Sequence, residues 1–77
     1  MVDILREKIA ELAYLEPDQI KPDDNIFESG YLDSMGFLTL VDFLKTTFRI
    51  EINDKDLIED NFKTINKIIN YVKSIAT

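Results

Sequence analysis

The sequence has 77 residues, a formal net charge of −6, and neither cysteine nor histidine. A chain of this length forms one small domain without room for a deep catalytic cleft, and the two missing residue types exclude disulfides, Ser-His and Cys-His nucleophile pairs and the common zinc sites. The negative charge disfavours nucleic acids and anionic membranes as partners and favours basic protein surfaces.

No internal repeat or boundary divides the chain, so residues 1–77 are expected to form a single domain. The sequence shows no signal peptide and no apolar run long enough to span a bilayer. The expected compartment is therefore the cytoplasm.

The first predicted helix runs from Asp3 to about Tyr14, and the Asp3 carboxylate is its candidate N-cap. The polar side of this segment carries charges of both signs and is expected to face solvent. The apolar residues recur at helical spacing on the opposite face, and they are Leu5, Ile9, Leu12 and Ala13.

Residues 15–33 show no sustained periodicity and contain two prolines, which predicts a long loop. The apolar residues that could anchor this loop to the helices are Ile20, Ile26, Phe27 and Leu32. The acidic cluster at residues 23–25 does not place oxygen ligands at alternate positions, and no glycine stands at the sixth position counted from either aspartate, so a calcium site is disfavoured. A second acidic group, at residues 54–60, fails the same test.

The second predicted helix begins at Ser34 and ends at Thr47 or Phe48. Asp33 is its candidate N-cap, and Gly30 permits a left-handed turn before the cap. The N-terminus of a helix carries partial positive charge and free N–H groups. It would favour a phosphate ester on the Ser34 hydroxyl by about 0.3–1 kcal/mol.

This helix is apolar around more of its circumference than one buried face requires. Leu38 and Phe43 are expected mainly to pack in the core, whereas Met35 and Phe37, beside the serine, are expected to contact a partner. The candidate partner-binding residues are Met35, Gly36, Phe37 and Leu38, so both interpretations of Leu38 stay open. The inward stripe is expected to consist of Leu40, Val41, Leu44 and Phe48.

Residues 49–52 are expected to form an extended linker in which Ile50 and Ile52 are half-buried. A short third helical turn should follow, capped by Asn53 or Asp54, with Leu57 and Ile58 facing inward near its end.

Thr64 is the candidate N-cap of the last predicted helix, and Tyr71 is expected on its surface. The apolar residues of this helix have the clearest amphipathic spacing in the chain and are predicted to be core. They are Ile65, Ile68, Ile69, Val72 and Ile75.

A resemblance to a known family rests on the run Gly30-Tyr31-Leu32-Asp33-Ser34-Met35, preceded by Phe27 and followed by an amphipathic helix. This run resembles the prosthetic-group site of acyl carrier proteins and peptidyl carrier domains, and similar features extend from about Ile4 to Val72. The Leu-Asp-Ser-Met-Gly form is similar to that of stand-alone carriers served by AMP-forming ligases, such as D-alanyl carrier proteins. The implied fold is all-α, a small four-helix bundle of the acyl-carrier type with a long first loop and a short third helix.

The resemblance implies that a phosphopantetheinyl transferase attaches 4′-phosphopantetheine covalently to Ser34, and that Asp33 takes part in the transferase encounter near the magnesium ion. The thiol of the arm would hold an acyl or aminoacyl group, supplied by a loading ligase and used by downstream acyl-processing enzymes. The protein itself would be a monomer and not an enzyme. The cost of a helical glycine at Gly36, about 0.5–1 kcal/mol relative to alanine, would make sense if a partner or the arm approaches the backbone there.

Asp42 is the only acid on the second helix, which departs from fatty-acid carriers and favours a specialised biosynthetic pathway over bulk fatty acid synthesis. The main alternative is an unmodified acidic helical module that binds a protein, and for it Ser34→Ala would leave function intact. A carboxylate-based or metal-dependent enzyme is disfavoured because the chain is too small for a cleft. The sequence leaves the cargo, the ligase and the pathway open, as well as whether the cargo lies within the bundle and whether the natural protein stands alone.

Overall fold

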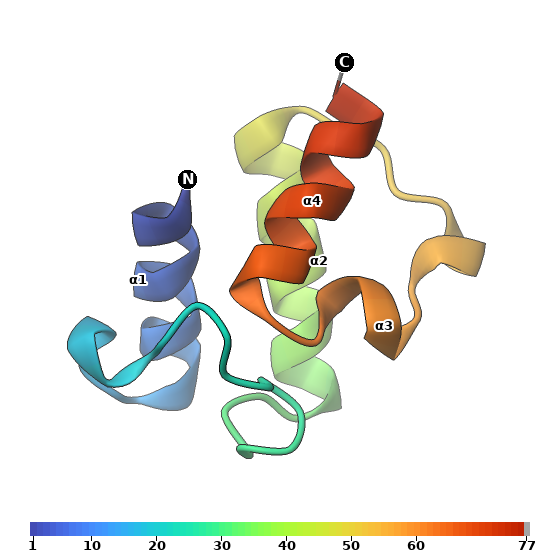
Figure 1. Cartoon of the computed structure of the whole chain (residues 1–77). Helices are drawn as coiled ribbons and strands as arrows, with labels where there is room; N and C mark the ends of the chain where they lie inside the picture. The colour runs from blue at the N-terminus through green and yellow to red at the C-terminus, as the bar shows by residue number, and fades with distance from the viewer. Residues whose placement is uncertain (77) are drawn as a thin grey trace.

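The computed structural model describes residues 1–76 and folds into helices and connecting loops, without a strand in that range (Figure 1). Two short 3₁₀ helices lie in the connections, η1 (Pro17–Gln19) and η2 (Asp54–Asp56). The predicted all-α architecture, with a long first loop and a short third helix, is confirmed. The four α-helices are α1 (Val2–Ala13), α2 (Ser34–Phe48), α3 (Glu59–Phe62) and α4 (Ile65–Ala76).

The hydrophobic core receives side chains from α1, α2, α3 and α4 and also from the long loop. Burial of these apolar side chains removes them from water, and it is the main favourable term in folding. No charged or polar residue of the described range is fully buried among them. The largest fully buried side chains are Leu5, Ile9, Ile20, Ile26, Leu40, Leu44, Phe62, Ile65, Ile68 and Val72.

The loop between α1 and α2 is held by its apolar anchors and by hydrogen bonds to the α3–α4 junction. The Ile26 N–H donates to the Lys63 carbonyl at 2.8 Å, and the Asn66 side chain donates to the Asp23 carboxylate at 2.6 Å. Ile20, Ile26 and Leu32 are buried and Phe27 is partly buried, which confirms the predicted anchors.

Tyr31 links two parts of the loop, because its hydroxyl donates a hydrogen bond to the Asp24 carboxylate at 2.9 Å. The backbone hydrogen bond from Lys21 and then this bond from Tyr31 lower the pKa of Asp24, and the same contact raises the pKa of Tyr31. The segment that leads to Ser34 is therefore an ordered part of the fold, although it has little regular secondary structure.

The ends of α1 differ from the prediction. The helix begins at Val2 with Met1 at the N-cap and no side-chain cap, so the predicted capping role of Asp3 is wrong. Asp3 lies instead inside the first turn, where its negative charge is favourable beside the free N–H groups. At the other end Tyr14 is the C-cap in a left-handed conformation, with φ 60° and ψ 40°.

Replacing Tyr14 with glycine is expected to raise the free energy of unfolding by about 0.5–1 kcal/mol, because a left-handed conformation is strained for a residue with a Cβ and not for glycine. The tyrosine side chain is 95% exposed, so its removal loses no packing. Urea denaturation measures the change, and Tyr14→Ala is the matched control because it removes the ring and keeps the Cβ. An equal effect of both substitutions would contradict the explanation by strain.

The connection between α2 and α4 differs most from the sequence-based expectation. The single predicted turn is split into η2 and α3, and Asn53 precedes η2 without a side-chain capping bond. Ile58 is 51% exposed, so its predicted inward position is wrong. Phe62 of α3 fills the core at this place instead, since a short helix beginning after Ile58 turns the aromatic residue inward. Ile50 and Ile52 of the linker are buried, more completely than predicted.

The last helix begins as predicted, since the Thr64 hydroxyl accepts a hydrogen bond from the Lys67 N–H at 3.0 Å. Four of the five predicted core residues of α4 are buried, but Ile75 is exposed in the last turn, beyond the core. The predicted surface position of Tyr71 is wrong. Its ring lies 5.2 Å from that of Phe62, centroid to centroid, and its hydroxyl donates to the Asp56 carboxylate at 2.9 Å.

Burial and the hydrogen bond to Asp56 raise the pKa of Tyr71 to about 12, from the usual value near 10. The stabilisation from the protonated tyrosine is therefore fully present below about pH 10 and is lost as the pH rises through about 12. We expect Tyr71→Phe to be less stable than the wild type at neutral pH and the difference to shrink above pH 10. Urea denaturation of both proteins over this range measures it, and a difference independent of pH would contradict the assignment.

No helix among residues 1–76 combines the length and the apolar character that crossing a bilayer requires.

Candidate functional site

The candidate site lies where the long loop enters α2, and its geometry follows from local sequence. Asp33 has an extended backbone, and its carboxylate accepts a hydrogen bond from the Gly36 N–H at 2.7 Å, so the predicted N-cap is confirmed. Gly30 has φ 78°, the left-handed turn that glycine permits, and Leu32 is buried between the turn and the cap. These three residues fix Ser34 as the first residue of α2.

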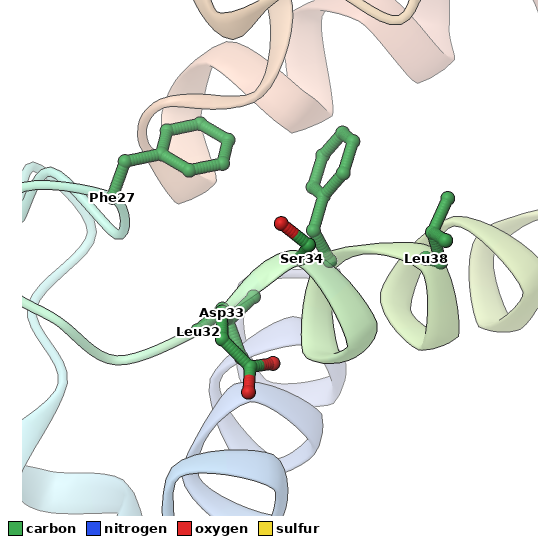
Figure 2. Close-up of a pocket in the computed structure, with 6 residues that line it drawn as sticks. Phe27, Leu32, Asp33, Ser34 and Leu38 are labelled. Carbon is green, nitrogen blue, oxygen red and sulfur yellow. The ribbon is translucent and has the colours of Figure 1, made fainter.

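The Ser34 side chain is exposed, and none of the hydrogen bonds found in residues 1–76 involves its hydroxyl. Figure 2 shows this hydroxyl and the Asp33 carboxylate pointing to different sides of the helix start. The N–H groups of Ser34 and Met35 lie at the positive end of the helix and likewise have no acceptor in the described range. The residues present therefore suit a phosphate ester on Ser34.

An apolar groove of about 410 Å³ opens beside the serine (Figure 2). Phe27 comes to it from the loop and Leu38 from the second turn of α2, and the Ser34 hydroxyl lies between these two side chains. A chain attached to Ser34 would thus leave the protein along an apolar surface. The lining residues are Phe27, Leu32, Asp33, Ser34, Phe37 and Leu38.

Phe37 belongs to a row of aromatic rings that connects the groove with the core. Its centroid lies 5.4 Å from that of Phe27 and 5.5 Å from that of Phe62, both in edge-to-face geometry. Such pairs stabilise beyond their buried area. Phe37 is only partly exposed, so packing accounts for much of its side chain, and a contact between Phe37 and a partner stays a prediction.

Met35 is 74% exposed and Leu38 is 55% exposed on the two turns that follow the serine. The core role expected for Leu38 is therefore wrong, because Leu40, Val41 and Leu44 take up the inward side of α2. Phe43 packs partly against the core, as predicted. Contact of Met35 and Leu38 with a partner stays a prediction.

Gly36 has a reason within the chain itself. A Cβ at this position would lie 3.3 Å from the Asp33 carboxylate and 3.3 Å from the Leu32 side chain, which is tighter than ordinary van der Waals contact. The glycine therefore leaves room for the cap and for the buried leucine. Close approach of a partner or an arm to the Gly36 backbone is not needed to explain it.

Sequence reasoning missed a second hollow, of about 240 Å³, on the other side of Asp33. The end of α1 contributes Tyr14 to it, the loop contributes Tyr31, and α2 contributes Gly36. No local sequence pattern could have indicated this hollow, because Tyr14 and Asp33 are far apart in the sequence and only the path of the loop brings them together.

Comparison with known proteins agrees with this geometry. Residues 3–72 match the family model described as phosphopantetheine attachment site. D-alanyl carrier proteins of Streptococcus pyogenes serotype M5 (strain Manfredo) and serotype M49 (strain NZ131) are each 28% identical over 74 residues, which cover 92% of this chain and 94% of the relative. The matched region extends from the first turn of α1 into α4. The chain therefore belongs to the carrier proteins that have a phosphopantetheine attachment site.

Proposed function

We propose that Ser34 bears the covalent 4′-phosphopantetheine of this carrier protein and that the chain presents an acyl or aminoacyl group to enzymes. The observation that carries this proposal is the state of the Ser34 hydroxyl. It is exposed at the capped start of α2, makes no hydrogen bond within residues 1–76, and borders an apolar groove. When bound, the arm supplies the thiol that holds the cargo as a thioester.

Attachment would form a phosphoester bond to the Ser34 oxygen and break the pyrophosphate bond of coenzyme A, with adenosine 3′,5′-bisphosphate as the leaving group. The hydroxyl proton must pass to a base of the transferase, because no group within residues 1–76 accepts a hydrogen bond from Ser34. The positive end of α2 favours the phosphate, and the Asp33 carboxylate keeps that helix end in place. Asp33 would also meet the transferase near its magnesium ion.

We place the cargo among aminoacyl or specialised acyl groups. The D-alanyl carrier relatives support this class, since their names state an amino acid as cargo. The surface of α2 supports it too, because Asp42 is the only acid on that helix. A ligase that activates the cargo, a phosphopantetheinyl transferase and downstream acyl-processing enzymes would be the partners, in a cytoplasmic pathway outside bulk fatty acid synthesis. The carrier, as a monomer, would present the cargo while its partners catalyse.

The test is intact-protein mass spectrometry after incubation with coenzyme A, magnesium and a broad-specificity phosphopantetheinyl transferase. We expect the mass to rise by one phosphopantetheine and fragmentation to locate the group on Ser34. A known carrier protein treated in parallel shows that the transferase is active. An unchanged mass of the folded protein beside a modified control would contradict the proposal and favour the unmodified interaction module.

A further inference from the structure

Phe37 lies between the groove beside Ser34 and the hydrophobic core. Its side chain lines the groove and also packs against the core cluster. The ring meets Phe27 of the loop at a centroid distance of 5.4 Å and Phe62 of α3 at 5.5 Å, both edge to face. Phe27 is partly exposed and Phe62 is fully buried, so this row of contacts passes from the groove into the core.

The position of Phe37 on α2 places its ring in the way of a group attached to Ser34. Residues three and four apart are neighbours on a helix surface, so Phe37 and Leu38 are the first side chains of α2 that such a group meets. Leu38 is 55% exposed, whereas Phe37 packs against the core. The Ser34 hydroxyl lies between the side chains of Phe27 and Leu38 (Figure 2). The Phe37 ring therefore occupies the route from the serine toward the core.

The obstacle on this route is steric, because the core would otherwise suit an apolar guest. No charged or polar side chain of the described range is fully buried there. Protein interiors are close-packed, so a chain could enter only by displacing the ring. Displacement would break the contacts of Phe37 with Phe27 and Phe62. It would also uncover Phe62, which packs against Tyr71 of α4 at a centroid distance of 5.2 Å.

We infer that Phe37 determines the class of cargo by keeping a chain attached to Ser34 on the protein surface; this inference rests on the proposed carrier function. A long acyl chain would then stay in water, which is unfavourable in proportion to its apolar area. An aminoacyl or short acyl group has little such area and can stay outside at small cost. Phe37 thus favours small cargo, and its replacement by alanine should open the core to a longer chain.

The test attaches alkyl chains of two lengths at position 34 without any transferase. The sequence has no cysteine, so Ser34→Cys provides a single thiol. Its thiolate, formed by loss of a proton to the buffer, attacks ethyl or octyl methanethiosulfonate. The new disulfide bond carries the alkyl group, and methanesulfinate leaves. Methyl resonances of ¹³C-labelled protein then report where each chain lies.

We expect the ethyl and octyl adducts to differ only at the groove, in the methyl resonances of Leu32 and Leu38. The methyl resonances of the fully buried residues Leu40 and Ile68 should be the same in both adducts. A difference between the adducts at these buried methyl groups, with Phe37 in place, would overturn the inference because it would put the octyl chain inside the bundle.

Phe37→Ala in the Ser34→Cys background is expected to take in the octyl chain, since an apolar space left by truncation binds apolar groups. Its octyl adduct should melt about 4 °C or more above its ethyl adduct, a shift that a modest gain in stability causes in a domain of this size. Circular dichroism measures both. Phe37→Leu is the matched variant of intermediate size, and it replaces the alanine variant in this comparison if the latter does not fold. Equal melting temperatures of the two adducts would overturn the role given to Phe37.

The failure of this inference can be told apart from the failure of the proposed function, because the cysteine adducts form without a transferase. A wild type that gains phosphopantetheine on Ser34, together with an octyl chain that enters the core past Phe37, leaves the proposed function standing and overturns the inference. A wild type that is never modified contradicts the carrier function. An octyl chain that stays in the groove would in that case still support the steric role of Phe37.

Discussion

Phe62→Ala is expected to lower the free energy of unfolding by about 3–5 kcal/mol, the usual cost of removing a buried aromatic side chain. Phe62 is fully buried, and its ring contacts those of Phe37 and Tyr71. Because α3 has only four residues, its backbone gains little stability of its own, and the phenylalanine holds it to the core. Small domains are stabilised by about 5 kcal/mol or somewhat more, so the variant should keep only about 0–2 kcal/mol of stability and be partly unfolded at room temperature.

Circular dichroism with urea titration measures this change. Ile58→Ala is the matched control, since Ile58 precedes the same helix and is exposed. Its substitution should alter the free energy of unfolding by no more than about 0.5 kcal/mol. If Phe62→Ala lowers the free energy of unfolding by less than 1 kcal/mol, the neighbouring aromatic rings can fill the cavity. This result would contradict the part that we assign to Phe62 in the core.

Ser34→Ala is expected to abolish the gain of phosphopantetheine completely and to leave the fold intact. Alanine has no oxygen to which the phosphate could be joined, so the loss is one of chemistry and not of affinity. The serine side chain is exposed and makes no hydrogen bond in residues 1–76, and Asp33 still caps the helix. We therefore expect the free energy of unfolding to change by no more than about 0.5 kcal/mol.

Ser29→Ala is the control for this prediction, because Ser29 lies in the same loop and is also exposed. It should be modified as fast as the wild type, within the error of the mass measurement. Modification of Ser34→Ala would move the attachment point to another hydroxyl and contradict the proposed site. If the wild type is not modified and the Ser34→Ala variant keeps the biological activity of the wild type, the protein is instead an unmodified interaction module.

The features that were predictable from sequence depend on residues close to each other along the chain. The caps at Asp33 and Thr64 join atoms three residues apart, so the starts of α2 and α4 could be located without a structure. The left-handed turn at Gly30 follows from glycine's lack of a Cβ. The amphipathic spacing of α1 and α4 likewise identified most of their buried residues, since one helical face repeats every three to four residues.

Side-chain burial was misjudged where it depends on neighbours that are distant in sequence. Leu38 and Ile58 are apolar yet exposed, and Tyr71 is polar at its tip yet packed against Phe62. Hydrophobic character alone could not decide these cases. Each segment is either short or apolar on all its faces, and burial depends on which face another element covers. The split of the third helical turn into η2 and α3 has the same origin, since Phe62 can reach the core only from the second of the two turns.

The sequence by itself determined the candidate attachment motif, the start of α2 at Ser34 and the character of the protein as a small acidic helical domain, because these rest on local hydrogen bonding and composition. Only the tertiary structure decided what surrounds the serine. The loop path brings Phe27 to one side of Asp33 and Tyr14 to the other, and buried anchors and long-range hydrogen bonds fix that path. The presence of one hollow on each side of Asp33 is therefore a property of the fold.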